Sequence, residues 1–156
     1  MRIFTAILLS SLFTLFALPA RAQDRTAQIV GAPDVPVRLE SAKVLNTGSQ
    51  PLVLLYAATN TSAAAIDQFT VTVFVYDTDG RLKARQVAPA RHELNVKETK
   101  YSAMVLDVGS IEPSDYLMAG VDQVQNAGSD QWWRTDLRTI AEAAADVRRG
   151  AARGKK

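Results

Sequence analysis

Apolar and polar residues alternate along several short stretches of the chain, and the clearest stretch is residues 66–76. Within it Phe69, Val71, Val73 and Val75 fall on one face, because successive side chains of a β-strand point to opposite sides. This alternation predicts a long central strand.

A second stretch, residues 52–59, is apolar on both faces. That pattern is typical of a strand covered on each side, or paired in the middle of a sandwich. Other short runs follow between turn residues, a spacing typical of β-sandwiches and barrels. They are residues 35–45, 81–87, a weaker segment at 92–96, and then 100–108, 116–124 and 131–134. We therefore expect an all-β, immunoglobulin-like antiparallel sandwich of seven or eight strands over residues 35–134.

The run Asp77-Thr78-Asp79-Gly80 follows the long strand. Gly80 can adopt positive φ, so the run predicts a hairpin turn, and the charges of residues 81–87 favour an edge strand. A calcium loop would also begin with such residues. However, Arg81 stands at the next ligand position and Ala88 at the twelfth, where a Glu is needed, so the turn interpretation is preferred.

The hydrophobic period changes after residue 134. An apolar stripe recurs at helical intervals and predicts an amphipathic helix over residues 135–150; its members are Leu137, Ile140, Ala141, Ala144 and Val147. Thr135 or Asp136 can cap its first turn, and Gly150 is expected to end it. The stripe is narrow and alanine-rich, so we expect light docking on the sandwich. A basic tail, residues 151–156, follows.

The start of the chain has the composition of a secretory leader. Met1-Arg2 is positive, residues 3–18 are apolar, and Ala20-Arg21-Ala22 matches the cleavage pattern. The apolar run is shorter than the roughly 20 residues of a membrane-spanning helix. We expect a signal peptide at 1–22, a periplasmic or secreted product without a stable membrane span, and an extended segment at 23–34.

The charge distribution also limits the classes of partner that the chain could bind. Beyond the leader the chain has 16 basic and 16 acidic residues, and five of the cations lie in the last nine positions. The body is acidic, which does not suit nucleic-acid binding. The basic tail could contact anionic envelope surfaces, although a solvated terminus is the default expectation.

The composition excludes much enzyme chemistry. The absence of cysteine and the single histidine, His92, exclude thiolate catalysis, disulfides and zinc sites that need two or more Cys or His ligands. His92 stands beside Arg91 and Glu93, and a solvated side chain is preferred over a general base or metal ligand. No nucleophile elbow, phosphate loop or dinucleotide motif occurs. We expect no enzymatic activity, metal or cofactor.

The pair Trp132-Trp133 is the main candidate binding feature. On a strand only one indole can enter the core, so the other needs a cover. The preferred interpretation is that the helix covers it through Leu137 and Ile140. The alternative is an exposed ring that serves as a sugar platform or partner anchor.

The run Val73-Phe74-Val75-Tyr76-Asp77, followed by Asp79-Gly80, resembles the signature of FxLYD-type domains, which are small exported immunoglobulin-like domains of bacteria. The resemblance spans residues 35–108, where Asn60 and Pro89 also fit the family pattern. Val73 and Val75 stand in place of its Phe and Leu. The resemblance implies a β-sandwich and export, and it transfers no catalytic residue or cofactor.

Together these features predict an exported, non-catalytic interaction module of the cell envelope. It would bind a protein or an envelope polymer through a sheet face, a strand edge or the Trp region. The alternative is a carbohydrate- or small-ligand-binding sandwich centred on Trp132 or Trp133.

Overall fold

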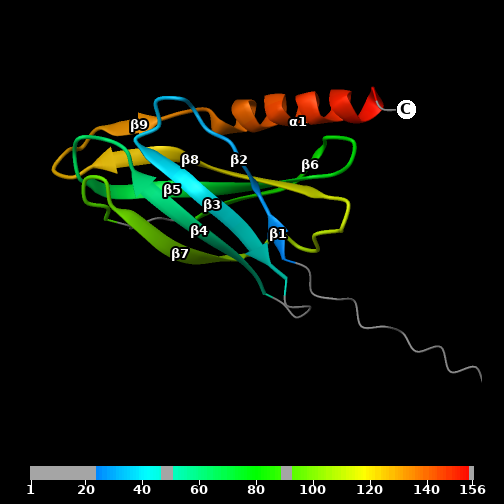
Figure 1. Cartoon of the computed structure of the whole chain (residues 1–156), viewed down its shortest axis with the longest axis horizontal. Coiled ribbons are helices and arrows are strands. Elements are labelled where there is room, and N and C mark those ends of the chain that lie inside the picture. The colour runs from blue at the N-terminus through cyan, green and yellow to red at the C-terminus, as the bar shows by residue number, and fades with distance from the viewer. Residues whose placement is uncertain (1–23, 47–50, 89–92, 155–156) are drawn as a thin grey trace, which may run out of the picture.

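The computed structural model describes residues 24–46, 51–88 and 93–154, which form two stacked β-sheets with one helix along an outer face (Figure 1). The expected signal peptide, His92, Pro89 and the last two residues of the basic tail lie outside these ranges. No helix within the described ranges combines the length and apolarity that a membrane crossing requires.

The first sheet has the strand order β1-β3-β4-β7, and the second has the order β2-β8-β5-β6, with β9 also paired to β8. The bounds of the first sheet are β1 (Arg25–Thr26), β3 (Val37–Leu45), β4 (Leu52–Asn60) and β7 (Thr99–Leu106). Those of the second are β2 (Gln28–Ile29), β5 (Ile66–Tyr76), β6 (Leu82–Ala88), β8 (Tyr116–Asn126) and β9 (Trp132–Arg134).

The connectivity is that of an immunoglobulin-like sandwich, as the strand pattern predicted. Strands β3, β4 and β7 face β9, β8, β5 and β6, which is the arrangement of strands A, B and E against G, F, C and C′. The long strand β5 has the predicted bounds, and Phe69, Val71, Val73 and Val75 point into the core between the sheets.

The predicted hairpin turn between β5 and β6 is confirmed. Gly80 has a φ of 77°, and the Asp77 carboxylate accepts hydrogen bonds from the backbone N–H groups of Asp79 at 2.9 Å and Arg81 at 2.8 Å. Strand β6 lies at the edge of the second sheet, as its charges predicted.

The segment expected to be extended, described from residue 24 to residue 34, takes part in both sheets. Strand β1 pairs with β3, and β2 pairs in parallel with β8, so this segment joins both sheets. The physical reason is the shortness of β9, which covers only Gln123 to Gln125 of the β8 edge. Strand β2 occupies the vacant part of that edge, at Met118 and Ala119.

The weaker segment at residues 92–96 does not form a strand where it is described. Leu94 makes only an isolated bridge with Ile66. It is held instead by Asn60, a fully buried side chain whose amide donates to the carbonyl groups of Ala64, Leu94 and Asn95 at 2.8, 3.3 and 3.1 Å.

The helix α1 (Leu137–Arg153) begins after Asp136, whose carboxylate accepts from the Thr139 N–H at 3.2 Å. The expected end at Gly150 is wrong, because the helix continues to Arg153. Glycine costs only about 1 kcal/mol relative to alanine inside a helix, so flanking helix formers can continue through it.

Candidate functional site

The two tryptophans point to opposite sides of β9, as strand geometry predicted. Trp133 is opposite Val124 and packs against the core between the sheets. Its indole N–H donates to the Asp34 carboxylate at 3.4 Å. Trp132 is opposite Gln125 on the other face of the second sheet. Both indoles are half-buried.

The expectation that Leu137 and Ile140 cover the outward tryptophan is wrong. Leu137, Ile140, Ala141 and Ala144 of the predicted stripe pack on a different part of the second sheet, whereas Val147, its last member, is 74% exposed. The partner surface is made of Val30, Phe74, Tyr76, Tyr116 and Met118. The reason is the path of the chain: after β9, the Thr135 N–H donates to the Asp122 carbonyl at 3.0 Å, and the helix then runs along the sheet away from β9 (Figure 1).

The sheet surface beside Trp132 is polar. The Gln68 amide donates to Gln125, and the Gln125 amide donates to the Ser129 carbonyl at 2.6 Å. Further along the same face, Thr70 donates to the Asp122 carboxylate, which lies 3.6 Å from the Arg85 guanidinium. These side chains largely satisfy one another's hydrogen-bonding groups. Their geometry is therefore better explained by a stabilised sheet surface than by a ligand site.

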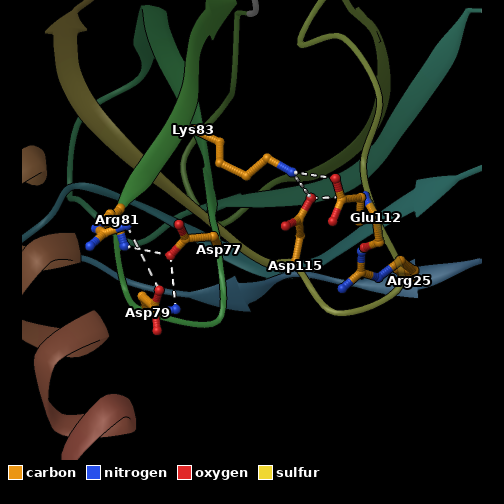
Figure 2. Close-up of polar contacts among 7 residues, drawn as sticks. All are labelled: Arg25, Asp77, Asp79, Arg81, Lys83, Glu112 and Asp115. Carbon is orange, nitrogen blue, oxygen red and sulfur yellow. Dashed lines mark hydrogen bonds and ion pairs between the residues drawn. The ribbon is translucent and has the colours of Figure 1, made fainter.

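Two groups of acidic and basic residues lie at one end of the sandwich, and Figure 2 shows them as separate sets. In the hairpin turn, the Asp77 carboxylate is occupied by backbone N–H groups, and Asp79 lies 3.8 Å from Arg81. Within the described ranges, no group of three or more His, Cys, Asp or Glu side chains could hold a metal ion.

The second set fastens the 112–115 loop to the sheets (Figure 2). The Lys83 ammonium lies 2.7 Å from the buried Asp115 carboxylate and 3.6 Å from Glu112. The hydrogen bond to Asp115 raises the pKa of Lys83 above its usual value. Arg25 donates to the Glu112 carbonyl at 2.7 Å. Asp115 also accepts from the Glu112 N–H at 2.8 Å. The cluster therefore has a structural role, which is to hold the 112–115 loop against the sheets.

Part of the C-terminal basic sequence is engaged with the fold. The Arg148 guanidinium lies 4.8 Å from the centre of the Tyr116 ring, a cation–π distance. Arg149 forms an ion pair with Asp146 at 2.6 Å. These two cations therefore belong to the docked helix.

A hollow of about 390 Å³ lies under the N-terminal segment. Its lining is mainly apolar and includes Val30, Pro33, Val37 and Leu39, with Arg38 as its one charged residue. The Arg38 guanidinium is bonded to Glu40 at 2.8 Å. Thr61 also lines the hollow, and its hydroxyl donates to the Val35 and Pro36 carbonyls at 3.2 and 3.0 Å. Both polar side chains of the lining are thus already bonded within the protein.

Among the described residues, the most exposed apolar surface lies on the outer side of the first sheet. We call it the β4–β7 face and define it as the outward side chains Val53, Leu55, Tyr101, Ala103 and Val105. Tyr101 is 84% exposed, Val105 56% and Leu55 40%. A shallow groove of about 480 Å³ runs over Leu55, Tyr101 and Ala103, with Lys43 at its border.

Strand β7 is also the last strand of the first sheet, and it forms a rim of the described molecule in Figure 1. The Gln86 side chain crosses from β6 and binds one end of this edge: its amide donates to the Val105 carbonyl at 2.9 Å and accepts from the Asp107 N–H at 2.6 Å. Alternate residues of a strand direct their backbone groups to the same side. Tyr101 and Ala103 therefore present their N–H and C=O groups to the free edge.

Sequence reasoning did not single out Tyr101, although one signal for this face was present. Residues 52–59 are apolar on both faces, which predicted a strand covered on each side. Strand β4 is central between β3 and β7, as the pattern allowed, but within the described chain only its inner side meets the core. Leu55 remains exposed on its outer side.

Comparisons with models of protein families, with curated proteins and with solved structures give no match to this chain. The class is therefore defined by the fold and the surface together: an immunoglobulin-like β-sandwich with an apolar face and a strand edge, β7, that no other strand of the described ranges pairs with.

Proposed function

We propose that this chain is an exported, non-catalytic interaction module of the cell envelope that binds protein by adding a partner strand to β7. The observation that carries the proposal is Tyr101, an 84% exposed aromatic side chain in the middle of an unpaired edge strand. Aromatic anchors and strand addition are two recurrent means of protein recognition.

The contrast between the two long sheet edges supports the choice of β7. Edge strands are commonly protected against pairing by charges and bulges. Strand β6 carries Lys83 and Arg85, and its pairing with β5 contains a register shift at Val75/Tyr76. The outward positions of β7 are Thr99, Tyr101, Ala103 and Val105, and none of them is charged. The one charged residue of β7, Lys100, lies on the inner side, so the outward side of this edge lacks the charges that β6 carries.

Export is part of the same proposal and rests on the leader-like residues 1–22. The chain has no cysteine, so it can fold in an oxidising compartment without forming incorrect disulfides. The resemblance of Val73-Phe74-Val75-Tyr76-Asp77 to FxLYD-type domains supports the same location. N-terminal sequencing of the processed protein should give Gln23 as the first residue, and a product that begins at Met1 would contradict export by this leader.

A photo-crosslinking amino acid placed at Tyr101 tests the binding surface in living cells. We expect covalent adducts at this position, because a partner strand on β7 would lie within reach of the side chain. The matched control is the same amino acid at Val147, which is 74% exposed but lies on α1. Adducts at Val147 alone, or at neither position, would refute the proposed binding face.

A second candidate function is carbohydrate binding, favoured by the position of Trp132 beside the amides of Gln68 and Gln125. Indole faces and amide groups are suited to sugar rings and hydroxyls. In a glycan array, Trp132→Ala should abolish binding while Tyr101→Ala leaves it intact. If the parent protein binds no glycan, this second candidate is rejected.

A further inference from the structure

We propose that the segment added to β7 runs parallel to it, belongs to another protein, and stops where the Gln86 side chain occupies the edge. The inference rests on the proposed function, because it names the direction and the side-chain pattern of the segment bound at the same edge. The bonds that Gln86 makes, and the backbone groups that it leaves free, carry the argument.

The Gln86 amide imitates one residue of a parallel strand. It donates to the Val105 carbonyl at 2.9 Å and accepts from the Asp107 N–H at 2.6 Å. In a parallel pair, one residue makes these same two bonds, to the residues before and after the one that it faces. In an antiparallel pair, the two groups would bond to two different partner residues. The amide therefore takes the place of a parallel residue that faces Leu106.

The groups that Gln86 leaves free fit a continuation of this parallel pattern. They run along the edge from the Val105 N–H to the Thr99 carbonyl, and no residue of the described ranges bonds to them. A parallel strand bonds them in consecutive pairs: the Ala103 carbonyl with the Val105 N–H, the Tyr101 carbonyl with the Ala103 N–H, and the Thr99 carbonyl with the Tyr101 N–H. These pairs end next to the position that Gln86 fills.

An antiparallel strand would leave one group without a partner. It would bond both groups of Thr99, Tyr101 and Ala103. The Val105 N–H would then lie between the last partner residue and the Gln86 amide. A donor that is shielded from water and has no acceptor is unfavourable. The parallel direction leaves only the Thr99 N–H unbonded, at the exposed start of β7, where water can accept from it.

The parallel direction also distinguishes the partner from a second copy of β7. In a parallel pair, residues that bond across the gap face residues that do not. Two identical strands related by a two-fold axis place each residue opposite its own copy or run antiparallel, so neither arrangement gives this offset. The partner segment therefore differs from β7, and we assign it to another protein.

The side chains of β7 indicate the pattern of the partner segment. Tyr101 and Val105 on the outward side are 84% and 56% exposed, whereas Lys100 and Ser102 on the inward side are polar. Residues that face each other in paired strands point to the same side of the sheet. We therefore expect apolar partner residues opposite the outward positions and polar residues between them, so that the partner extends the β4–β7 face.

The direction can be measured by mapping cross-links. A photo-crosslinking amino acid replaces Thr99 in one variant of the full chain and Val105 in another, and mass spectrometry of the digested adducts identifies the partner residue that each captures. The two positions are about 20 Å apart at the usual rise per residue. We expect the residue captured from position 105 to lie C-terminal to the residue captured from position 99, in the same partner segment. The reverse order, or capture of one residue from both positions, would overturn the parallel direction.

A second experiment tests the role of Gln86. A photo-crosslinking amino acid at Asp107 lies just beyond β7, beside the position that the Gln86 amide occupies. Gln86→Ala frees the Val105 carbonyl and the Asp107 N–H, so the partner can extend, and adducts at position 107 should become more abundant. The matched control is Gln131→Ala, at an exposed glutamine before β9, which should leave their yield unchanged. Circular dichroism checks that the variants keep the fold, and equal yields in all backgrounds would overturn the stop at Gln86.

The outcomes separate this inference from the proposed function. Adducts that map in the expected order on another protein support both. Adducts that map in the reverse order overturn the parallel direction and leave β7 as a binding edge. Adducts that join only two copies of this chain overturn the assignment to another protein. The absence of adducts at Tyr101, Thr99 and Val105 refutes the binding face itself.

Discussion

Gly120 lies where three parts of the chain meet, and we expect Gly120→Ala to destabilise the fold strongly. A Cβ atom at this position would lie 2.2 Å from the Val30 carbonyl oxygen and 2.9 Å from Leu137 Cδ1. The first distance is far below van der Waals contact. The atom that a Cβ would strike is the backbone carbonyl oxygen of Val30, which follows β2. The Val30 N–H in turn donates to the Ala119 carbonyl at 2.9 Å.

The magnitude follows from what has to move. Overpacking a closely packed site costs about 1–3 kcal/mol, and displacing Val30 also weakens a hydrogen bond that contributes about 1 kcal/mol. We therefore expect the free energy of unfolding to fall by about 2–4 kcal/mol. With a slope of about 2 kcal/mol per molar urea, the unfolding midpoint should fall by about 1–2 M.

Urea unfolding followed by circular dichroism measures the effect, and Gly31→Ala is the matched control. Gly31 is next to Val30, but a Cβ there meets nothing within 4 Å. Its substitution should leave stability unchanged or raise it by up to about 1 kcal/mol. If Gly120→Ala unfolds at the same urea concentration as the parent, then β2 and the start of α1 do not pack over β8 as described.

Three further predictions concern the interior polar groups and the helix. Asn60→Asp removes the amide that donates to three carbonyls and places a buried charge beside them, so urea unfolding should show a loss of about 3 kcal/mol or more; an equally stable variant would contradict the role of the amide. Asp136→Ala removes the N-cap of α1 and should cost about 1 kcal/mol in the same assay, and no loss would show that the cap is dispensable. Burial raises the pKa values of Tyr76 and Tyr116 above the usual 10.0, so the stability gained from the neutral phenols is complete below pH 10 and is lost as pH rises through the raised values. Absorbance at 295 nm should show these two phenols ionising late, together with alkaline unfolding and with Tyr56, whose pKa burial also raises, and the double change to Phe should reduce that late step to the contribution of Tyr56; phenols that all ionise together before unfolding would contradict their burial.

The strand that the sequence predicted best is β5, whose bounds match the prediction. Polar and apolar residues alternate from Gln68 to Val73, which identified its core face. Strand β4 gave a weaker signal, because a two-sided apolar pattern does not say what covers the second side. The two-residue strands β1 and β2 are too short to carry any alternation.

The candidate site was harder to predict than the fold. The sequence singled out Trp132-Trp133, but it could not say which indole enters the core, because that depends on the pairing of β9 with β8. It also predicted the apolar stripe of α1 without its partner surface, which is the Phe74–Tyr116 region and not Trp132. Tyr101 carries no motif, and it became a candidate only when β7 was found at the edge of its sheet.

Local periodicity was sufficient to establish an all-β sandwich, its hairpin turn at Gly80 and a C-terminal helix, since each depends on residues that are close in the chain. The edges and faces that remain open depend on contacts between distant segments. The N-terminal residues reach β8 because β9 is short, and β7 remains unpaired because no described strand lies beyond it. Backbone groups at a sheet edge have no signature in the local sequence, so the surface available to a partner emerged only from the assembled sheets.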